Sequence, residues 1–548
     1  AMEKGTAKRV QKRYRVLWDQ NSGQAGYYNP PLSPERVAQG HFGFFAGRPV
    51  DAYVGAPGCN AGYTVAWPTK VKNAEFMVDR LNSGAAIGSV QLWRHAENLR
   101  RLWDAGHDPI ALEVAEAQRL GIDHWIRLSM NDWHHWGADG NEVNLQSSHF
   151  YDNHPEYLIG QEGTQGWTGK LANVLPWFQD FSHAAVRALR LDLAVEACSR
   201  YEITGFLYDF MRCPGYFKYG EEAAGAQIMT QFMRDTRQAL DRVGQHKGRS
   251  VGLAVRVPNT IAGSKKLGLD IATWMAEDLV DFVVPSCFFG QDMEEDISAW
   301  VELGRATQVQ VYPAIEEGYV AGHTSGFRRW YFNAPVMTPL SNEMIRALAA
   351  RHLWRGADGI YVFNFFGTAP TYDYDNRDVL DDIAEPLRLQ YKNKLYVVAR
   401  SHDSFPNCLE TERQIPKAVT AQPLSCTMDI PDDMARAAER LLAIRLWVHL
   451  DNLTIEDELA VHFNQELLSC SNPMQAGAYD PTPDTWLSFD LMSHLPRQGT
   501  NTITLCMVRS NAQLAGQVEV VIMDIELEVC YEYPDGEWRR VRGWSPRT

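Results

Sequence analysis

Short β-branched or aromatic runs alternate eight times with longer amphipathic stretches over the first 390 residues. In the longer stretches, such as 182–201 and 225–243, apolar residues recur near the 3.6-residue period of a helix. Eight strand–helix repeats are the pattern of an α/β protein built as a (β/α)8 TIM barrel, and the alternative is an open, doubly wound sheet. No GxGxxG follows the first run, so the sequence predicts a closed barrel over residues 1–394. The predicted strands are 14–19, 50–55, 123–129, 205–210, 250–255, 282–286, 309–316 and 359–365, and further helices are predicted at 96–120, 342–355 and 379–390.

After about residue 395 the pattern changes to short runs in which apolar and polar residues alternate, with turn residues between them. Period-two alternation at this spacing is typical of an antiparallel β-sandwich. The sequence therefore predicts a second domain at 395–548, a β-sandwich of the jelly-roll kind. We favour a structural brace for the barrel over a carbohydrate-binding module, because beyond Trp447, Trp486 and Trp538 this region offers no aromatic triplet.

Charge and cysteine usage restrict the partners. Lysine plus arginine number 52 and aspartate plus glutamate 68, and the resulting charge of −16 repels nucleic-acid phosphates and anionic membranes. No apolar run approaches the roughly 18 residues that cross a bilayer. The nine cysteines show no CxxC and no Cys/His ligand spacing, so neither a metal nor another cofactor is expected. The sequence does not indicate an oligomeric state.

The N-terminal segment 1–13 is charged and contains no apolar stretch. We expect a signal peptide to have been removed, and we place the protein in the periplasm or outside the cell.

Carboxylates stand at the C-terminal ends of predicted strands, where a barrel carries its reactive groups. Asp209 closes an otherwise apolar strand, although strand propensity and burial both disfavour aspartate there. Glu316 and Glu317 end the seventh strand, and alternation turns Glu316 inward. Asp292, after the sixth strand, is an alternative partner for Asp209. Structural roles remain open: Asp209 could pair with Arg212, and Glu317 could form a surface salt bridge.

The segment after the third strand mixes polar side chains with indoles. Asn131, Asp132 and His134 are interleaved with Trp133 and Trp136. Aromatic rings stack on the apolar face of a sugar while amides and imidazoles bond its hydroxyls, so this segment is a candidate sugar subsite. Asp132 and His134 alone are too few to hold a metal, and a structural loop is the alternative.

Two carboxylates among polar and aromatic residues, without a phosphate loop or a metal cage, are what glycoside cleavage requires. One carboxyl protonates the leaving oxygen, and the other attacks the anomeric carbon or activates water. Weaker candidates, which lie in or follow predicted strands, complete the predicted site: Asp19, Trp67, Tyr208, Arg256, Glu294 and Asn364.

The stretch GFLYDFMRCP at 205–214, preceded by AAVRALR at 184–190, resembles the strand-four motif of glycoside-hydrolase-like (β/α)8 proteins. The stretches AVHFNQELL at 460–468 and GTNTITL at 499–505 resemble the jelly-roll modules attached to bacterial polysaccharide-degrading enzymes, although Gln465 replaces their glycine. The resemblance implies a barrel followed by a jelly roll, with Asp209 as the leading carboxylate. It does not fix the partner of Asp209.

The first hypothesis is a glycoside hydrolase that cleaves a polysaccharide or an oligosaccharide. Asp209 acts as nucleophile or base and Glu316 as acid, or the reverse, with Asp292 in reserve. Arg212 and Arg256 would suit an acidic or sulfated glycan of algal or microbial origin. We expect Asp209→Asn to lower activity at least about a hundredfold and to leave folding intact.

Two alternatives remain. A non-catalytic glycan-binding barrel predicts that the carboxylates are engaged in ion pairs. A polysaccharide lyase predicts that a pair such as His134 and Tyr208 abstracts a proton.

Overall fold

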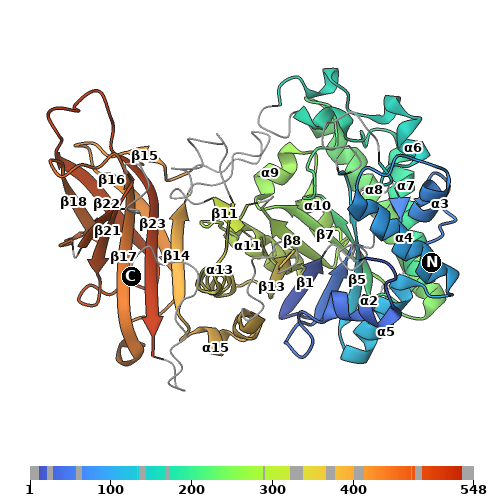
Figure 1. The fold of residues 1–548 in the computed structure, drawn as a ribbon, viewed down its shortest axis with the longest axis horizontal. Coiled ribbons are helices and arrows are strands. Elements are labelled where there is room, and N and C mark those ends of the chain that lie inside the picture. Colours follow the sequence, from blue (N-terminus) through green and yellow to red (C-terminus); the bar gives the residue numbers. More distant parts are fainter. Residues whose placement is uncertain are drawn as a thin grey trace, which may run out of the picture.

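The chain forms a parallel barrel followed by two packed antiparallel sheets, which confirms the predicted fold class (Figure 1). A computed structural model provides the coordinates. The residues it describes are 12–20, 29–56, 64–132, 134, 144–167, 173–287, 290–316, 318–320, 337–365, 377–399, 413–470, 472–475 and 484–532.

The barrel strands are all parallel, in the order β10-β13-β1-β2-β5-β6-β7-β8-β9. Strands that follow one another in the chain are therefore neighbours in the sheet, as the repeated strand–helix pattern predicts. The strands are β1 (Val16–Gln20), β2 (Ala52–Gly55), β5 (Asp123–Ser129), β6 (Gly205–Asp209), β7 (Gly252–Pro258), β8 (Phe282–Ser286), β9 (Gln310–Val311), β10 (Ala314–Ile315) and β13 (Ile360–Phe363).

The seventh predicted strand is split at Pro313, which has no N–H to donate to a neighbouring strand. The half before it, β9, pairs with β8, and the half after it, β10, pairs with β13. The Tyr312 N–H donates to the carbonyl of Val283 at 3.0 Å, and the Pro313 carbonyl accepts from Tyr361 N–H at 3.1 Å. The two halves together occupy one position and close the barrel.

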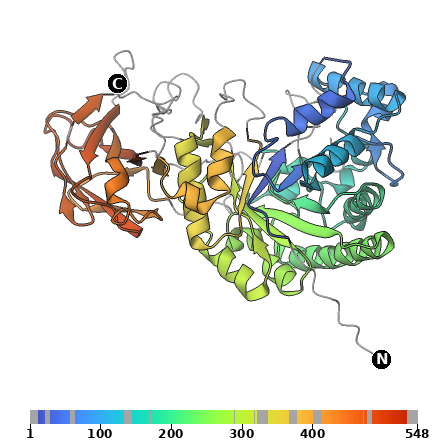
Figure 2. The ribbon, with the colours of Figure 1, turned by 90° about the horizontal axis from the view of Figure 1, so that it is seen from below.

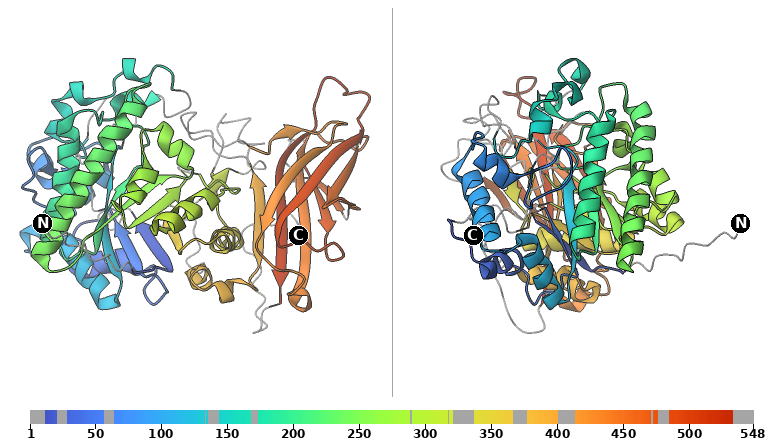
Figure 3. Two further views of the ribbon diagram at one scale, coloured as in Figure 1. Left: turned by 180° about the vertical axis from the view of Figure 1, so that it is seen from behind. Right: turned by 90° about the vertical axis from the view of Figure 1, so that its right-hand side faces the viewer.

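Helices surround the strands, as Figures 2 and 3 show. They bury the outward-facing strand residues in a layer that includes Ile126 of β5 and Val283 of β8. The main helices are α2 (Pro34–Phe42), α4 (Val90–Asp104), α5 (Pro109–Leu120), α7 (Ala184–Arg200), α8 (Glu222–Lys247), α9 (Ile261–Lys266), α10 (Ile271–Ala276), α11 (Ser298–Thr307) and α13 (Asn342–Arg355).

Two predicted helices are each broken into two. The stretch 96–120 contains the end of α4 and all of α5, because Gly106 turns the chain with a φ of 81° and Asp108 starts a new helix. Asp108 accepts hydrogen bonds from the N–H groups of Ile110 and Ala111, and Pro109 occupies the first helical position. The stretch 379–390 likewise contains α14 (Val379–Ile383) and α15 (Pro386–Leu389), which begins at a proline.

The C-terminal region contains two antiparallel sheets that pack on one apolar core, as predicted. One sheet comprises β14 (Lys394–Ala399), β15 (Lys417–Ala418), β17 (Leu441–Asp451), β20 (Asn472–Gln475), β21 (Asp484–Asp490) and β23 (Val521–Tyr531). The other comprises β16 (Leu424–Ile430), β18 (Glu458–Phe463), β19 (Glu466–Leu467) and β22 (Gly499–Arg509).

Strand β14 contacts both parts of the molecule through its alternating faces. Tyr396 and Val398 lie in the core of the sandwich, whereas Val397 and Ala399 pack in a barrel cluster with residues of α13. Figure 1 shows α13 between the two parts. The limits 1–394 and 395–548 stay a prediction, and β14 begins at that boundary. Among the described helices, none combines the length and hydropathy that a membrane crossing requires.

Candidate functional site

Charged side chains fill the C-terminal end of the barrel interior. Each belongs to the inward-facing set at or near the end of its strand: Asp19 in β1, Arg127 in β5, Asp209 in β6, Arg256 in β7 and Glu316 just after β10. All five are at most 2% exposed. Alternation explains their convergence, because residues two positions earlier in these strands, such as Leu207, lie in the apolar cluster of the interior.

These five residues form one continuous chain of ion pairs, which we call the carboxylate network. Arg127 donates to Asp19 at 3.0 Å and to Asp209 at 2.7 Å. Arg256 donates to Asp209 at 3.2 Å and to Glu316 at 2.5 Å. The predicted carboxylate pair, Asp209 and Glu316, is therefore bridged by one guanidinium.

Neighbouring groups complete the hydrogen bonding of the network. The Met211 N–H donates to Asp209 at 2.8 Å, and the Ser286 hydroxyl donates to Glu316 at 2.7 Å. The Tyr361 hydroxyl donates to Asp19. The ring of Phe363 lies 3.7 Å from the guanidinium carbon of Arg256, a cation–π contact.

Three carboxylates face two guanidinium groups, so the ionised network has a net charge of −1. Burial acts to raise the pKa of Asp209, but the charges of Arg256 and Arg127 hold it below its ordinary value. Asp19 behaves oppositely, because burial raises its pKa despite the charge of Arg127. Asp209 is therefore ionised at neutral pH and is not suited to act as a general acid.

A second polar group, Asp132, His134 and Arg212, follows β5 and β6. The buried Asp132 accepts hydrogen bonds from the backbone N–H and Nδ1 of His134. Arg212 lies 3.0 Å from Nε2 of His134 and 3.7 Å from Asp132. An imidazole in this position donates its Nδ1–H to the carboxylate and accepts from the guanidinium at Nε2. Burial raises the pKa of Asp132, but His134 and Arg212 more than offset this and lower it.

The group of Asp132, His134 and Arg212 reaches the surface, unlike the carboxylate network. The His134 side chain is 38% exposed. Arg212 lies beside Asp132, whereas Arg127 and Arg256 bond directly to Asp209, and the charge of Arg212 contributes to lowering the pKa of Asp209.

Buried amides near these groups have unsatisfied polar atoms. Both side-chain polar atoms of Gln179 and Oδ1 of Asn364 are buried and have no hydrogen-bond partner among the residues that the structure describes. Asn364 has a φ of 53° and donates its backbone N–H to the backbone carbonyl of Asp19 at 2.9 Å. Asn131, by contrast, is fully engaged, because its side chain donates to the carbonyls of Gly215 and Gln179 and accepts from Gln179 N–H. Unpartnered buried amides are uncommon and often mark a place for water or ligand.

The loop after β8 brings further acids beside Glu316. The Gln291 side chain donates to Glu295 at 3.3 Å and accepts from the Glu316 N–H at 3.0 Å. Burial raises the pKa of Glu295 well above its ordinary value and that of Glu294 to about 7. Asp292 accepts from the Glu294 N–H at 2.9 Å. Sequence reasoning selected Asp292 and missed Glu295, although the acidic run 292–296 was the available signal.

Two predicted substrate-binding residues lie elsewhere. Trp67 is buried, donates its indole N–H to Glu196 at 2.8 Å and packs edge-on against Tyr201. Tyr208 faces the helices, where its hydroxyl lies 3.3 Å from the Arg190 carbonyl. Neither remains a candidate for substrate contact, and the lyase pair of His134 with Tyr208 is not formed. Trp133, Trp136 and Glu317 lie outside the described residues.

Arg127, like Glu295, was missed by sequence reasoning. Arg127 lies on the same face of the strand as Trp125 and Ser129, so alternation predicts that it points inward. A single arginine in an apolar strand does not, however, indicate which carboxylates it pairs with. Within the part of the chain that the structure describes, no group of three His, Cys, Asp or Glu side chains could hold a metal ion.

Neither a family model nor a curated protein matches this sequence. Among solved structures, a family GH18 chitinase from Chromobacterium violaceum has a TM-score of 0.32 at 10% identity, covering 93% of this chain and 91% of that chain. A cycloisomaltooligosaccharide glucanotransferase from Paenibacillus sp. has a TM-score of 0.34 at 10% identity, covering 94% of this chain and 57% of that chain. An α-L-fucosidase from Paenibacillus thiaminolyticus has a TM-score of 0.40 at 10% identity, covering 68% of this chain and 49% of that chain.

The chain therefore spans about half the length of the last two proteins. Similarity at this level carries no argument about reaction, substrate or catalytic residues.

Proposed function

We propose that the C-terminal end of the barrel is a carbohydrate site and that the protein is a glycoside hydrolase. The observation that carries this proposal is the pairing of Asp209 and Glu316 by the single guanidinium of Arg256. The shared guanidinium holds the two carboxylates close together, and the two carboxyl groups of a glycosidase pair lie about 5 to 9.5 Å apart. Both stand at strand ends on the face where barrels perform chemistry.

The electrostatics distinguish the two carboxylates. Asp209, whose pKa two arginines lower, supplies the permanent negative charge that stabilises a developing oxocarbenium ion or attacks it. Glu316 is then assigned the proton-donating role, and it must take up a proton when substrate binding separates it from Arg256, because the ion pair favours the ionised carboxyl. The Gln291 side chain joins the buried Glu295, whose pKa burial raises well above its ordinary value, to the backbone N–H of Glu316, and this contact helps to position Glu316. These assignments choose one of the two orders that the sequence left open.

We propose a neutral glycan as the substrate, in place of an acidic or sulfated one. Around the site three arginines, Arg127, Arg212 and Arg256, face four carboxylates. The arginines are thus already neutralised, and an anionic sugar would find no unpaired cation among them. The accessible His134, together with the Gln179 amide and Oδ1 of Asn364, which have no partner among the described residues, suits the hydroxyls of a neutral sugar.

A non-catalytic glycan-binding protein is the second candidate. One observation favours it: Asp209 and Glu316 are closed to solvent and engaged in ion pairs, so hydrolysis by this pair requires a rearrangement that opens the site. The exposed group of Asp132, His134 and Arg212 could still bind a sugar at the rim.

The test is product analysis on a panel of neutral polysaccharides, including chitin, cellulose, starch and dextran. A hydrolase releases new reducing ends, and Glu316→Gln reduces the rate at least about a hundredfold. The control is Glu466→Gln, which changes an exposed glutamate of the sandwich and leaves the rate unchanged. Binding to one insoluble glycan without any product supports the second candidate. On a uronic-acid polysaccharide such as alginate, products that absorb in the ultraviolet, as unsaturated uronates do, contradict both.

A further inference from the structure

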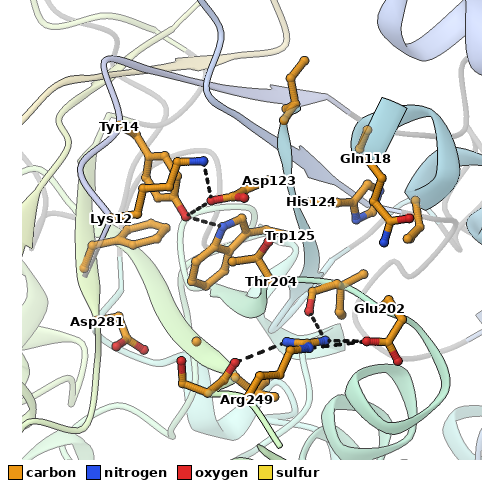
Figure 4. A pocket seen from close by; sticks show the side chains of 18 of the residues that line it. Lys12, Tyr14, Gln118, Asp123, His124, Trp125, Glu202, Thr204, Arg249 and Asp281 are labelled. Atoms are coloured by element: carbon orange, nitrogen blue, oxygen red, sulfur yellow. Dashed lines mark hydrogen bonds and ion pairs between the residues drawn. The ribbon is translucent and has the colours of Figure 1, made fainter. Parts of the chain in front are cut away.

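The N-terminal end of the barrel carries an open cavity, whereas the carboxylate network at the C-terminal end is buried. Figure 4 shows the cavity, about 560 Å³ in volume, with Arg249 paired to Glu202 among its lining residues. At the C-terminal end, residues 291–296 after β8 pack beside Glu316. We call this segment the acidic loop, because four of its six residues are aspartate or glutamate. Both parts of the molecule contact it.

Helix α13 holds the backbone of the acidic loop from the barrel side. Arg351 donates to the carbonyl of Met293, and Arg355 donates to the carbonyl of Glu295 at 2.9 Å. Arg355 also pairs with Asp296 at 3.1 Å. The two arginines are four residues apart and so lie on one face of the helix. That face fixes the path of the loop backbone.

Gln414 holds the acidic loop from the sandwich side. Its side chain donates to the carboxyl group of Glu294. The same side chain is fixed by Thr427 of β16, because its Oε1 accepts from the Thr427 N–H at 2.6 Å and its Nε2 donates to the Thr427 carbonyl at 2.9 Å. The neighbouring Ile415 is buried in the core of the sandwich. Gln414 therefore links β16 of the sandwich to Glu294 of the acidic loop.

Asp429, two residues farther along β16, makes the second contact. It accepts from Arg355 and, at 2.6 Å, from the hydroxyl of Thr500. Thr427 and Asp429 share the face of β16 opposite Met428, which lies in the core of the sandwich. Strand β16 thus reaches the acidic loop by two routes, one through Gln414 and the other through Arg355.

The acidic loop in turn holds the segment that carries Glu316. The buried Gln291 accepts from the Glu316 N–H at 3.0 Å through its side chain and donates its own N–H to the Gly318 carbonyl at 2.7 Å. Its side chain also donates to Glu295 at 3.3 Å. These bonds fix the backbone at Glu316 and at Gly318, so a displacement of the acidic loop displaces Glu316.

We propose that the sandwich positions Glu316, and that Gln414 and Asp429 are positioning residues that act through the acidic loop. A structural brace requires only that the two parts adhere, whereas these contacts converge on the loop that bonds to the Glu316 backbone. The effect on the reaction rests on the proposed function, because it depends on Glu316 as the proton donor.

The first test is hydrogen–deuterium exchange of the full chain, followed by mass spectrometry. Gln414→Leu should raise the exchange rate of the segment around Glu316 at least about tenfold, and Asp429→Ala at least about threefold, because the acidic loop then opens more often. The exchange rate of β7 should stay unchanged. Wild-type exchange around Glu316 overturns the proposal. An equal rise in β7 also overturns it, because the contacts then only stabilise the barrel.

Two matched control variants change the same residue types elsewhere in the sandwich. Gln498→Leu removes an amide that donates to the Pro431 carbonyl at 2.8 Å. Asp490→Ala removes a carboxylate that accepts from the Met492 N–H at 2.8 Å. Both controls should leave the exchange of both segments at the wild-type rate. A control that raises exchange around Glu316 as much as Gln414→Leu does overturns the assignment to Gln414 and Asp429.

The second test is kinetic, on whichever of chitin, cellulose, starch and dextran gives the most reducing ends with the wild-type chain. Gln414→Leu should lower kcat at least about tenfold and change KM less than about twofold, because a misplaced acid slows the reaction without removing substrate contacts. An unchanged kcat overturns the role in the reaction. A wild-type chain that hydrolyses none of the four refutes the proposed function, and the exchange rates around Glu316 still decide whether the sandwich positions this residue.

Discussion

The two ends of the barrel interior are built from the same strands but from opposite kinds of side chain. At the N-terminal end Tyr14, Trp125, Phe282 and Tyr312 pack as one aromatic cluster, with successive ring centres 4.9–6.3 Å apart. At the C-terminal end the carboxylate network takes the same inward positions. Trp125 and Arg127 are two residues apart on one strand.

The two ends differ in how much their buried side chains contribute to the free energy of folding. An aromatic cluster gains free energy from apolar burial, whereas buried ion pairs lose hydration and recover it only through close mutual contacts. Three carboxylates and two arginines in the barrel interior therefore contribute less to stability than an aromatic cluster of similar size. The aromatic end holds the strands, and the charged end is the place to look for chemistry.

The largest expected effect comes from Arg256→Leu. It removes the guanidinium shared by Asp209 and Glu316 and leaves both carboxylates buried with fewer partners, so the free energy of unfolding should fall by about 3–5 kcal/mol. The matched change at the other end is Arg249→Leu, which breaks a partly exposed pair with Glu202 and should cost at most about 1 kcal/mol. Urea denaturation of both variants measures this. Equal midpoints would contradict the comparison.

Asp209→Asn tests the chemistry of the charged end. Activity on the substrate should fall at least about a hundredfold, because the permanent charge is lost. Unlike the expectation from sequence alone, stability should fall as well, by about 1–3 kcal/mol, since Arg127 and Arg256 lose an anionic partner. The matched control is Asp123→Asn, a partly exposed aspartate at the N-terminal end. Unchanged turnover by Asp209→Asn would refute the assignment.

Gly252→Ala tests the packing of the aromatic end. The added methyl would lie 2.3 Å from the Trp125 indole, and overpacking of this kind costs about 1–3 kcal/mol. A smaller ring makes space, so Gly252→Ala combined with Trp125→Phe should be less destabilised than the two single changes added together. Thermal denaturation of the four proteins in this cycle measures the coupling, and strict additivity would show that the two residues do not compete for space.

The smallest expected effect is a pH dependence from Glu294, near the charged end. Its folded-state pKa of about 7 lies above its ordinary value of 4.5, so the native state binds more protons between these pH values than the unfolded state does. This contribution to stability is complete below about pH 4.5 and is lost as the pH rises through 7. Glu294→Gln should flatten the stability profile between pH 5 and 7, whereas Glu466→Gln should leave it unchanged. A profile that keeps its slope in Glu294→Gln assigns the dependence to another group.

The eight strand–helix repeats were enough to predict the barrel, and alternation along the seventh strand was enough to predict the inward position of Glu316. The same rule places Tyr312 and Ala314 in the interior and Ile315 in the outer layer, as the structure confirms. The breaks in the predicted helices were also legible, because the Asp108-Pro109 pair is a helix start.

The partners of Asp209 were not legible, because they depend on register between strands that are distant in sequence. Asp209 lies beside Arg256 in the pairing of β6 with β7 and beside Ser129 in the pairing of β5 with β6. Sequence alone offered Arg212, three residues away, as a possible ion-pair partner of Asp209. Trp67 failed for a related reason: an indole in a polar loop is equally consistent with a sugar platform and with a side chain buried by a distant helix.

Because β14 packs on both parts of the molecule, the two parts are expected to unfold together. Val397 and Ala399 pack against the barrel, and Tyr396 and Val398 pack in the core of the sandwich. Removing either part would therefore expose apolar side chains of the other. Scanning calorimetry should therefore show a single unfolding transition for the whole chain. A truncated barrel that ends before Lys394 should self-associate through the apolar surface that β14 covers in the full chain.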